Sequence, residues 1–438
     1  MIINMRQKQK TGLVFFPAFD WSLGASHPER EERLLYTQEQ MLEEGVLDLP
    51  QVKQYSPAIC SLEDVERAQA VFPDMQTHSL EAHRIAAGSA LVLGEAWCRG
   101  DIKNGFALVR PPGHHAGAVV WANRGFCTLN NEAILVNKLR AHYGIRKVAI
   151  IDTDVHHGDG TQDIFYHDPN VLFISLHQDG RTLYPGSGYV DEQGGPNAWG
   201  TTLNIPLLPG MGDEAFLYAL EEIVLPRLEA FQPELIINSA GQDNHFTDPL
   251  GKMNVTAQGY GRITELLKPD IAVLEGGYSI QGALPYVNMA IFLALCQEDY
   301  AGVTEHSSPI REEIKGEKLR TYFETLKAEY PTVPPAWRRA SEPFLPSADW
   351  VERDFSVFYD TDSFKENRRE YIRRCPDCGG TVLLMTQNMM TYEKGVVVRI
   401  PFAACPDCRK EGEALYAQFQ EQDSPMNRVV LQNQTGGV

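Results

Sequence analysis

The sequence predicts an α/β fold built around a parallel β-sheet, followed by a smaller C-terminal module. Between residues 12 and 296, short β-rich runs alternate with segments whose apolar residues recur at helical spacing. The β-rich runs are apolar enough to be covered by helices on both faces, as strands of parallel sheets are. Polar clusters follow directly after several runs, at the edge where such sheets bind ligands.

The expected elements follow from these patterns in chain order. Strands are expected at residues 106–110, 147–152, 171–176, 202–205, 235–239 and 271–274. Amphipathic helices are expected at residues 130–143 and 213–231, where the apolar spacing is helical. A charged helical stretch at 311–330 closes this part of the chain.

The domain boundary is expected in a proline-rich segment. The β/α alternation stops after residue 298, and the composition changes beyond residues 331–346. We therefore expect a main domain at residues 1–330, a linker at 331–346 and a C-terminal extension at 347–438.

Composition and charge exclude several classes of protein. The 438 residues are 43% hydrophobic and 22% charged, which excludes collagenous, coiled-coil and wholly disordered chains. A net charge of −19 repels nucleic acid and favours cationic partners. Residues 1–10 are basic with no apolar segment after them, and no apolar stretch approaches the roughly 20 residues that span a bilayer. We expect a cytoplasmic protein without membrane contact.

A cluster of ionisable side chains follows the expected strand at 147–152. Asp152, Asp154 and His156 project to the same side if this segment is extended. Two carboxylates and an imidazole suit a divalent cation. The alternative is a solvated acidic turn.

Further polar clusters follow the other expected strands. His114 and His115 stand in a rigid Pro-Pro-Gly turn, where neighbouring imidazoles can divide proton transfer and electrostatic work, or form a plain surface pair. Asp243 could complete a metal site, although a loop aspartate is usually a cap. Tyr278 follows a Gly-Gly pair and could place its phenol over such a site, or simply pack in a turn.

Taken together, these motifs resemble the histone deacetylase superfamily, which includes acetoin-utilisation-type proteins and acetylpolyamine amidohydrolases. The resemblance covers roughly residues 12–300. Its motifs stand in the family's order at residues 27–30, 110–116, 124–127, 152–160, 175–177, 184–188, 239–243, 248–251 and 275–278. It implies an arginase/deacetylase-like three-layer fold with a central eight-stranded parallel sheet, and makes residues 1–330 a zinc-dependent catalytic domain.

The resemblance also implies metal ligands. Asp154, His156 and Asp243 would bind the catalytic zinc, with positions left open for water and the substrate carbonyl. It further implies a potassium site formed by backbone and side-chain groups. The residues around that site are Asp152, Asp154, His156, Ser175 and Leu176.

The catalytic residues implied by the resemblance are the tandem His114 and His115, with Asp152 and Asp159 as their respective partners, and Tyr278 as donor to the carbonyl oxygen. The implied mechanism is removal of a proton from metal-activated water by His115 and stabilisation of the oxyanion by Tyr278.

The expected substrate is an N-ε-acyl-lysine side chain of a protein or peptide. The resemblance makes Phe126 and Tyr184 the walls of a narrow tunnel, although the family has Phe at the second position. Leu250 gives an apolar rim, which argues against acetylated polyamines, the nearest alternative substrate. Two further classes are a non-catalytic acyl-lysine-binding scaffold and an arginase-like ureohydrolase, whose second metal's ligands are absent here.

The C-terminal extension carries two Cys-x-x-Cys pairs. Cys375, Cys378, Cys405 and Cys408 flank β-rich segments at 381–385 and 396–400, which predicts a four-thiolate zinc ribbon over residues 375–408. A module below about 70 residues has little core, so the structural zinc would supply much of its folding energy. Disulfides or redox motifs are the alternatives. Docking over the active-site rim, contact in an oligomer and recruitment of a partner remain open as roles.

Overall fold

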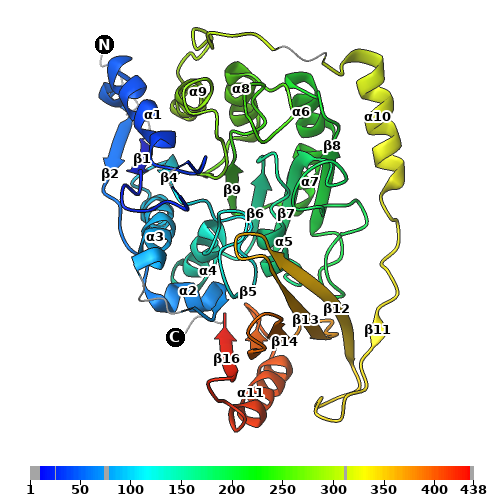
Figure 1. Cartoon of the computed structure of the whole chain (residues 1–438). Helices are drawn as coiled ribbons and strands as arrows, with labels where there is room; N and C mark the ends of the chain where they lie inside the picture. Colours follow the sequence, from blue (N-terminus) through cyan, green and yellow to red (C-terminus); the bar gives the residue numbers. More distant parts are fainter. Residues whose placement is uncertain (1–9, 25, 74–77, 310–312, 435–438) are drawn as a thin grey trace, which may run out of the picture.

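A parallel sheet of eight strands forms the centre of the molecule (Figure 1). The computed structural model describes residues 10–24, 26–73, 78–309 and 313–434. The strand order is β2-β1-β4-β10-β9-β6-β7-β8, and every neighbouring pair is parallel. The strands are β1 (Thr11–Phe16), β2 (Val52–Tyr55), β4 (Asn104–Val109), β6 (Val148–Asp152), β7 (Val171–Gln178), β8 (Thr202–Leu207), β9 (Leu235–Ala240) and β10 (Ile271–Leu274).

Helices cover both faces of this sheet. Successive strand side chains point to opposite faces, so Phe106 and Leu108 of β4 join one hydrophobic core while Ala107 and Val109 join the other. The first core is covered by α1 (Glu32–Glu43), α6 (Asp213–Ala219), α7 (Leu225–Phe231), α8 (Ala257–Leu267), α9 (Leu284–Cys296) and α10 (Gly316–Glu329). The second is covered by α2 (Leu62–Ala68), α3 (His78–Cys98), α4 (Asn131–Tyr143) and α5 (Asp159–Phe165). The predicted three-layer fold is confirmed.

The predicted elements are present, and the structure adds strands. β1 and β2 were not among the predicted strands, and β2 is a half-exposed edge strand whose sequence, Val-Lys-Gln-Tyr, lacks an apolar run. The helix predicted at 213–231 is continuous but contains a π-helical turn, Leu220–Val224, between α6 and α7. The stretch predicted at 311–330 contains α10, and its residues 311–312 lie outside the described part of the chain.

Short elements complete the main domain. They are the 3₁₀ turn Val46–Asp48 and a two-stranded sheet of β3 (Ala70–Val71) and β5 (Val119–Val120). Over the described residues, no helix combines the length and apolarity that crossing a membrane requires.

The C-terminal module, residues 338–434, is a six-stranded sheet with one helix. Its strands, in sheet order, are β11 (Arg338–Arg339), β12 (Trp350–Tyr359), β13 (Phe364–Arg373), β14 (Val382–Asn388), β15 (Lys394–Ile400) and β16 (Asn427–Asn433). All pairs are antiparallel except β15 and β16. The helix α11 (Pro406–Gln420) packs on β15. Figure 1 shows the module, yellow at β11 and red at β16, beside α4, α5 and β5.

The module shares a hydrophobic core with the main domain. Val351, Ile372 and Val382 of its sheet belong to the same buried cluster as Leu135 of α4 and Ile150 of β6. The module is therefore packed onto one helical face of the central sheet.

Candidate active site

Four adjacent strands of the central sheet deliver polar clusters to one edge. β4, β10, β9 and β6 are neighbours, and the segments after them contain His114 and His115, Tyr278, Asp243, and Asp154 with His156. Because these strands are parallel, their carboxyl ends meet at the same edge. The sheet thus assembles residues that lie far apart in the sequence.

Asp154, His156 and Asp243 place one ligand atom each within 4.8 Å of the others. The His156 Nδ1 atom lies 3.1 Å from Asp154 Oδ1 and 3.1 Å from Asp243 Oδ2. Backbone N–H groups orient the carboxylates: Gly276 donates to Asp154 Oδ2 at 2.7 Å, and Val155 donates to Asp243 Oδ1 at 2.8 Å.

Glycine is required beside this triad. A Cβ at Gly241 would lie 2.0 Å from Asp154 Oδ2, and one at Gly276 would lie 2.2 Å from Asp243 Oδ2. The close approach of the backbone is what allows the carboxylates to converge.

The charges of the triad fit a divalent cation. Asp154 and Asp243 are fully buried. Burial and the neighbouring Asp154 carboxylate raise the pKa of Asp243 to about 7. Burial lowers the pKa of His156, but hydrogen bonds to Asp154 and Asp243 outweigh this and raise it to about 10. Two adjacent buried carboxylates need a compensating positive charge, and a cation bound by two oxygens and one nitrogen would supply it.

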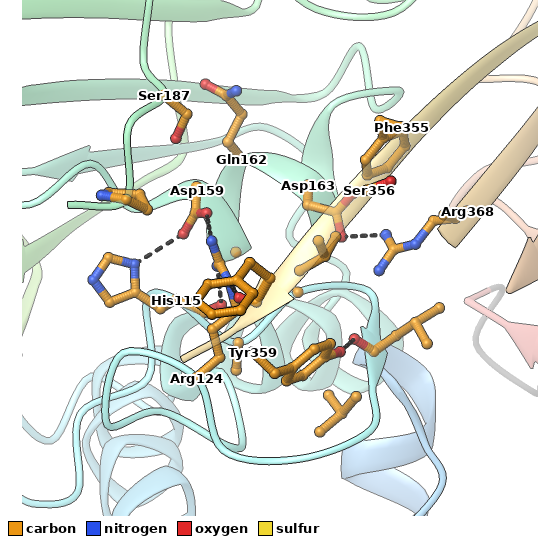
Figure 2. Close-up of a pocket in the computed structure, with 18 of the residues that line it drawn as sticks. His115, Arg124, Asp159, Gln162, Asp163, Ser187, Phe355, Ser356, Tyr359 and Arg368 are labelled. Atoms are coloured by element: carbon orange, nitrogen blue, oxygen red, sulfur yellow. Dashed lines mark hydrogen bonds and ion pairs between the residues drawn. The ribbon is translucent and has the colours of Figure 1, made fainter. Parts of the chain in front are cut away.

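The tandem histidines have different partners. His114 Nδ1 lies 3.0 Å from Asp152 Oδ2, and His115 Nδ1 lies 2.8 Å from Asp159 Oδ1. The other oxygen of Asp159 forms an ion pair with Arg124, as Figure 2 shows. The His115 partner is therefore itself held by a guanidinium.

The same surroundings separate the pKa values of the two imidazoles. Burial, together with the adjacent His114, lowers the pKa of His115 to about 3. Burial also lowers that of His114, but the carboxylates of Asp154 and Asp152 outweigh it and raise the pKa well above its usual value. The His115 imidazole is therefore the neutral one of the pair at pH 7.

Tyr278 is fixed through its backbone and its ring. Its backbone N–H donates to Asp248 Oδ2 at 2.7 Å, and the Arg33 guanidinium carbon lies 4.9 Å from the ring centroid. Burial raises the pKa of the phenol well above its usual value, so Tyr278 remains a proton donor at neutral pH. Arg33 also donates to the Gly277 carbonyl at 2.7 Å and to Glu29 at 2.8 Å.

Aromatic rings surround the histidines and Tyr278. The Phe126 ring lies 5.6 Å from that of Tyr278, and the Tyr184 ring lies 5.1 Å from that of His115 and 6.2 Å from that of His156. Leu250 is half-buried, and its backbone N–H donates to Asp248 at 2.9 Å. Asp248 thereby connects the Leu250 loop to Tyr278.

The residues predicted for a potassium site come from two neighbouring strands: Ser175 and Leu176 lie on β7, next to β6, which leads into the triad. Asp152 at the end of β6 pairs in register with Ser175 of β7, which is followed by Leu176. Ser175 Oγ is 2.8 Å from His177 Nδ1. The potassium site stays a prediction.

The four cysteines of the C-terminal module also converge. Their sulfur atoms lie within 4.8 Å of one another, and all four are free thiols. Backbone N–H groups of Asp377 and Gly380 point to the sulfurs of Cys375 and Cys378, each at 3.4 Å. Such N–H···S contacts stabilise thiolates, the form that binds metal, so the donor set fits a structural metal ion.

Sequence reasoning missed the residues that support the site from a distance. Glu29 stands in one of the motifs of the resemblance, residues 27–30, but no role was predicted for it; it is fully buried between Arg33 and Arg110. Asp360 belongs to the C-terminal module, and its side chain reaches Gly125 and Tyr184. The resemblance ends before that module, so only the fold could bring Asp360 to this site.

Comparisons with known proteins agree with this geometry. The model of the histone deacetylase domain matches residues 51–292. A probable deacetylase of Archaeoglobus fulgidus is 42% identical over 323 residues, covering 67% of this chain and 89% of that protein. A histone deacetylase-like amidohydrolase of Pseudomonas aeruginosa is 35% identical over 261 residues, 57% of this chain and 66% of that protein.

A solved structure is similar as well. The crystal structure of the HD domain of HDA15 superposes with a TM-score of 0.63 at 31% identity, over 74% of this chain and 96% of that one. The family model ends well before the C-terminal module begins at residue 338. With more than half of its residues matched, the chain belongs to the histone deacetylase family.

Proposed function

We propose that this chain is a zinc-dependent amidohydrolase that removes acetyl or other short acyl groups from N-ε-acyl-lysine side chains. One observation carries the proposal: the Asp154–His156–Asp243 triad lies at the same sheet edge as two further groups. These are the neutral imidazole of His115 and the protonated phenol of Tyr278. Amide hydrolysis requires a proton acceptor for water and a donor for the carbonyl oxygen, and this site offers both.

The metal would be held by Asp154, His156 and Asp243. When bound, a divalent cation polarises the amide carbonyl and lowers the pKa of a water molecule. The carboxylates are already oriented for this role by the backbone N–H groups of Gly276 and Val155.

The side chains around the triad would move the protons. Asp159 accepts the Nδ1–H of His115, which leaves Nε2 free to accept a proton from water. Tyr278 would donate its phenolic hydrogen to the carbonyl oxygen as negative charge develops there. His115 would then return its proton to the departing amine, and His114, whose Nδ1 lies 3.0 Å from Asp152 Oδ2, would contribute electrostatically beside it.

The substrate class follows from the walls and rim. Phe126 and Tyr184 would enclose an aliphatic linker, and the four methylenes of lysine suit such walls. Leu250 has no charge with which to bind the distal ammonium group of an acetylated polyamine at the rim. The net charge of −19 nevertheless favours cationic ligands, which keeps acetylated polyamines as the second candidate.

The domain organisation belongs to the same proposal. We assign catalysis to residues 1–330, the connection to 331–346, and a second, structural zinc to residues 375–408 within the extension 347–438. That connection already contains β11, which pairs with β12 of the module. Support for the second zinc comes from the four converging sulfur atoms.

A kinetic comparison tests the proposed function. Purified protein is assayed on peptides carrying N-ε-acyl-lysine with different acyl groups and on acetylspermidine, together with elemental analysis for metals. We expect the peptides to have the higher kcat/KM, and His115→Ala and Asp154→Ala to abolish turnover. A strong preference for acetylspermidine would replace the substrate, and unchanged activity in both variants would overturn the site.

A further inference from the structure

The C-terminal module reaches the candidate active site through the turn between β12 and β13. The Asp360 carboxylate oxygen Oδ1 accepts the backbone N–H of Gly125 at 2.9 Å and the hydroxyl of Tyr184 at 3.1 Å. Next to it, Arg124 Nε donates to the Phe358 carbonyl at 2.9 Å. These contacts join the turn to both sides of the site.

The residues that Asp360 holds belong to the two aromatic walls. Tyr184 is one wall itself, and Gly125 directly precedes Phe126, the other wall. The Asp360 Oδ1 atom therefore connects the backbone next to Phe126 with the side chain of Tyr184. No other residue of the module forms a hydrogen bond to either wall among the contacts of the described chain.

The backbone under Phe126 needs such support. Gly125 and Phe126 both have positive φ, +53° and +68°. The left-handed conformation of Phe126 is unfavourable by about 1 kcal/mol or more for a residue with a Cβ, so surrounding contacts must maintain it. At Gly125 a Cβ would lie 2.4 Å from the His115 ring, which ties this turn closely to the histidine.

The hydroxyl group of Tyr184 has a specific partner in the module. Burial raises the pKa of its phenol, so the hydroxyl keeps its hydrogen and requires an acceptor. Asp360 is that acceptor.

We propose that Asp360 is a positioning residue that sets the separation of the Phe126 and Tyr184 walls and thereby makes the C-terminal module a determinant of substrate specificity. This inference rests on the proposed function, because the walls matter only if they enclose the acyl-lysine. Asp360 touches neither the triad nor Tyr278, so its loss changes substrate binding more than the chemical step.

The first test compares Asp360→Ala with a matched control. Asp362→Ala removes the same charge from the same turn, and Asp362 is exposed. We expect Asp360→Ala to raise KM about tenfold on acetyl-lysine peptide with kcat changed less than about twofold, and to reduce the discrimination between acetyl and longer acyl groups. Asp362→Ala should leave both constants unchanged. Equal KM values for the two variants would overturn the inference.

Two further variants distinguish a positioning role of Asp360 from a general loss of structure. Asp360→Asn keeps an acceptor oxygen and should restore KM to within about threefold of the unmodified protein. Tyr184→Phe removes one bond without altering the module, so adding Asp360→Ala to it should raise KM less than Asp360→Ala does alone. Fully multiplicative effects, or no rescue by asparagine, would contradict the shared role.

Amide hydrogen exchange distinguishes failure of this inference from failure of the proposed function. The Gly125 N–H is bonded to Asp360, so exchange in the peptide containing it should accelerate in Asp360→Ala and not in Asp362→Ala. Unchanged exchange overturns the inference whatever the activity. An unmodified protein that hydrolyses no acyl substrate overturns the proposed function, even if the exchange result confirms the contact.

Discussion

Individual residues of the candidate site owe their chemistry to burial and to one specific neighbour each. His115 and His114 are adjacent in sequence and equally buried, yet the pKa is lowered in one and raised in the other. The difference arises because His114 faces Asp152 and Asp154, whereas the Asp159 partner of His115 is already paired with Arg124. One fold thus shifts the pKa values of two adjacent imidazoles in opposite directions.

Tyr278→Phe should lower kcat on an acyl-lysine peptide by about a hundredfold or more. The variant keeps the ring over Arg33 and loses only the hydroxyl that would donate to the developing oxyanion. Steady-state kinetics and thermal unfolding on the same preparation check this. An unchanged kcat would show that Tyr278 plays no part in turnover.

Glu29→Gln should lower the free energy of unfolding by about 3–5 kcal/mol. Glu29 is fully buried and pairs with Arg33 at 2.8 Å and with Arg110 at 2.5 Å, so removing its charge leaves two buried guanidinium groups without a counter-ion. Urea unfolding measures the change. Glu31→Gln, an exchange at a half-exposed neighbour, serves as the control and should have little effect.

At the scale of single elements, β13 shows a strand whose buried face is charged. Residues 364–370 alternate between buried and exposed, and Glu366, Arg368 and Glu370 are on the buried side. Arg368 bonds to Asp163 of α5 at 2.7 Å, and Glu370 lies 3.2 Å from His167 in the main domain. Figure 2 shows the Asp163–Arg368 pair among the residues that line a pocket between the main domain and the module. Ion pairs, besides apolar contacts, join the module to the main domain.

Arg368→Met should lower the free energy of unfolding by about 3–5 kcal/mol, because the buried Glu366 and the half-buried Asp163 would lose their cation. The adjacent Arg369 pairs with Asp354 and both side chains are exposed, so Arg369→Met should cost less than about 1 kcal/mol. Denaturant titration of both variants makes the comparison. Similar losses at the two positions would contradict a buried ion-pair interface.

At the scale of the whole molecule, the main domain and the C-terminal module are packed around a common core. Side chains of β12, β13, β14 and β15 belong to the same hydrophobic cluster as those of α3 and α4. A disturbance of the module is therefore expected to reach the main domain.

Metal counting tests the whole-molecule picture. We expect two zinc-type ions per chain, and the double variant Cys375→Ser, Cys378→Ser should lose one while the ion at Asp154 is retained. Cys98→Ser, which removes a thiol outside the cluster, should lose none. An unchanged count in the double variant would refute a thiolate metal site.

The sequence by itself determined the local features of this protein. Apolar runs predicted six strands of the central sheet because buried parallel strands need apolar residues on both faces, and the clusters after them contained the triad, the histidines and Tyr278. The Cys-x-x-Cys pairs likewise predicted that the four sulfur atoms lie close together. Apolar runs and Cys-x-x-Cys spacings can be recognised in the sequence because each depends only on residues that are close together in the chain.

Only the tertiary structure decided which distant groups meet. The edge strand β2 is half-exposed and carries no apolar run, so only its pairing with β1 identifies it as part of the sheet. Glu29 becomes a buried counter-ion only when Arg33 and Arg110 pack around it. Asp360 reaches Tyr184 across 176 positions of the chain because the module packs on the main domain. Contacts of this kind depend on packing between elements, which no local pattern of residues records.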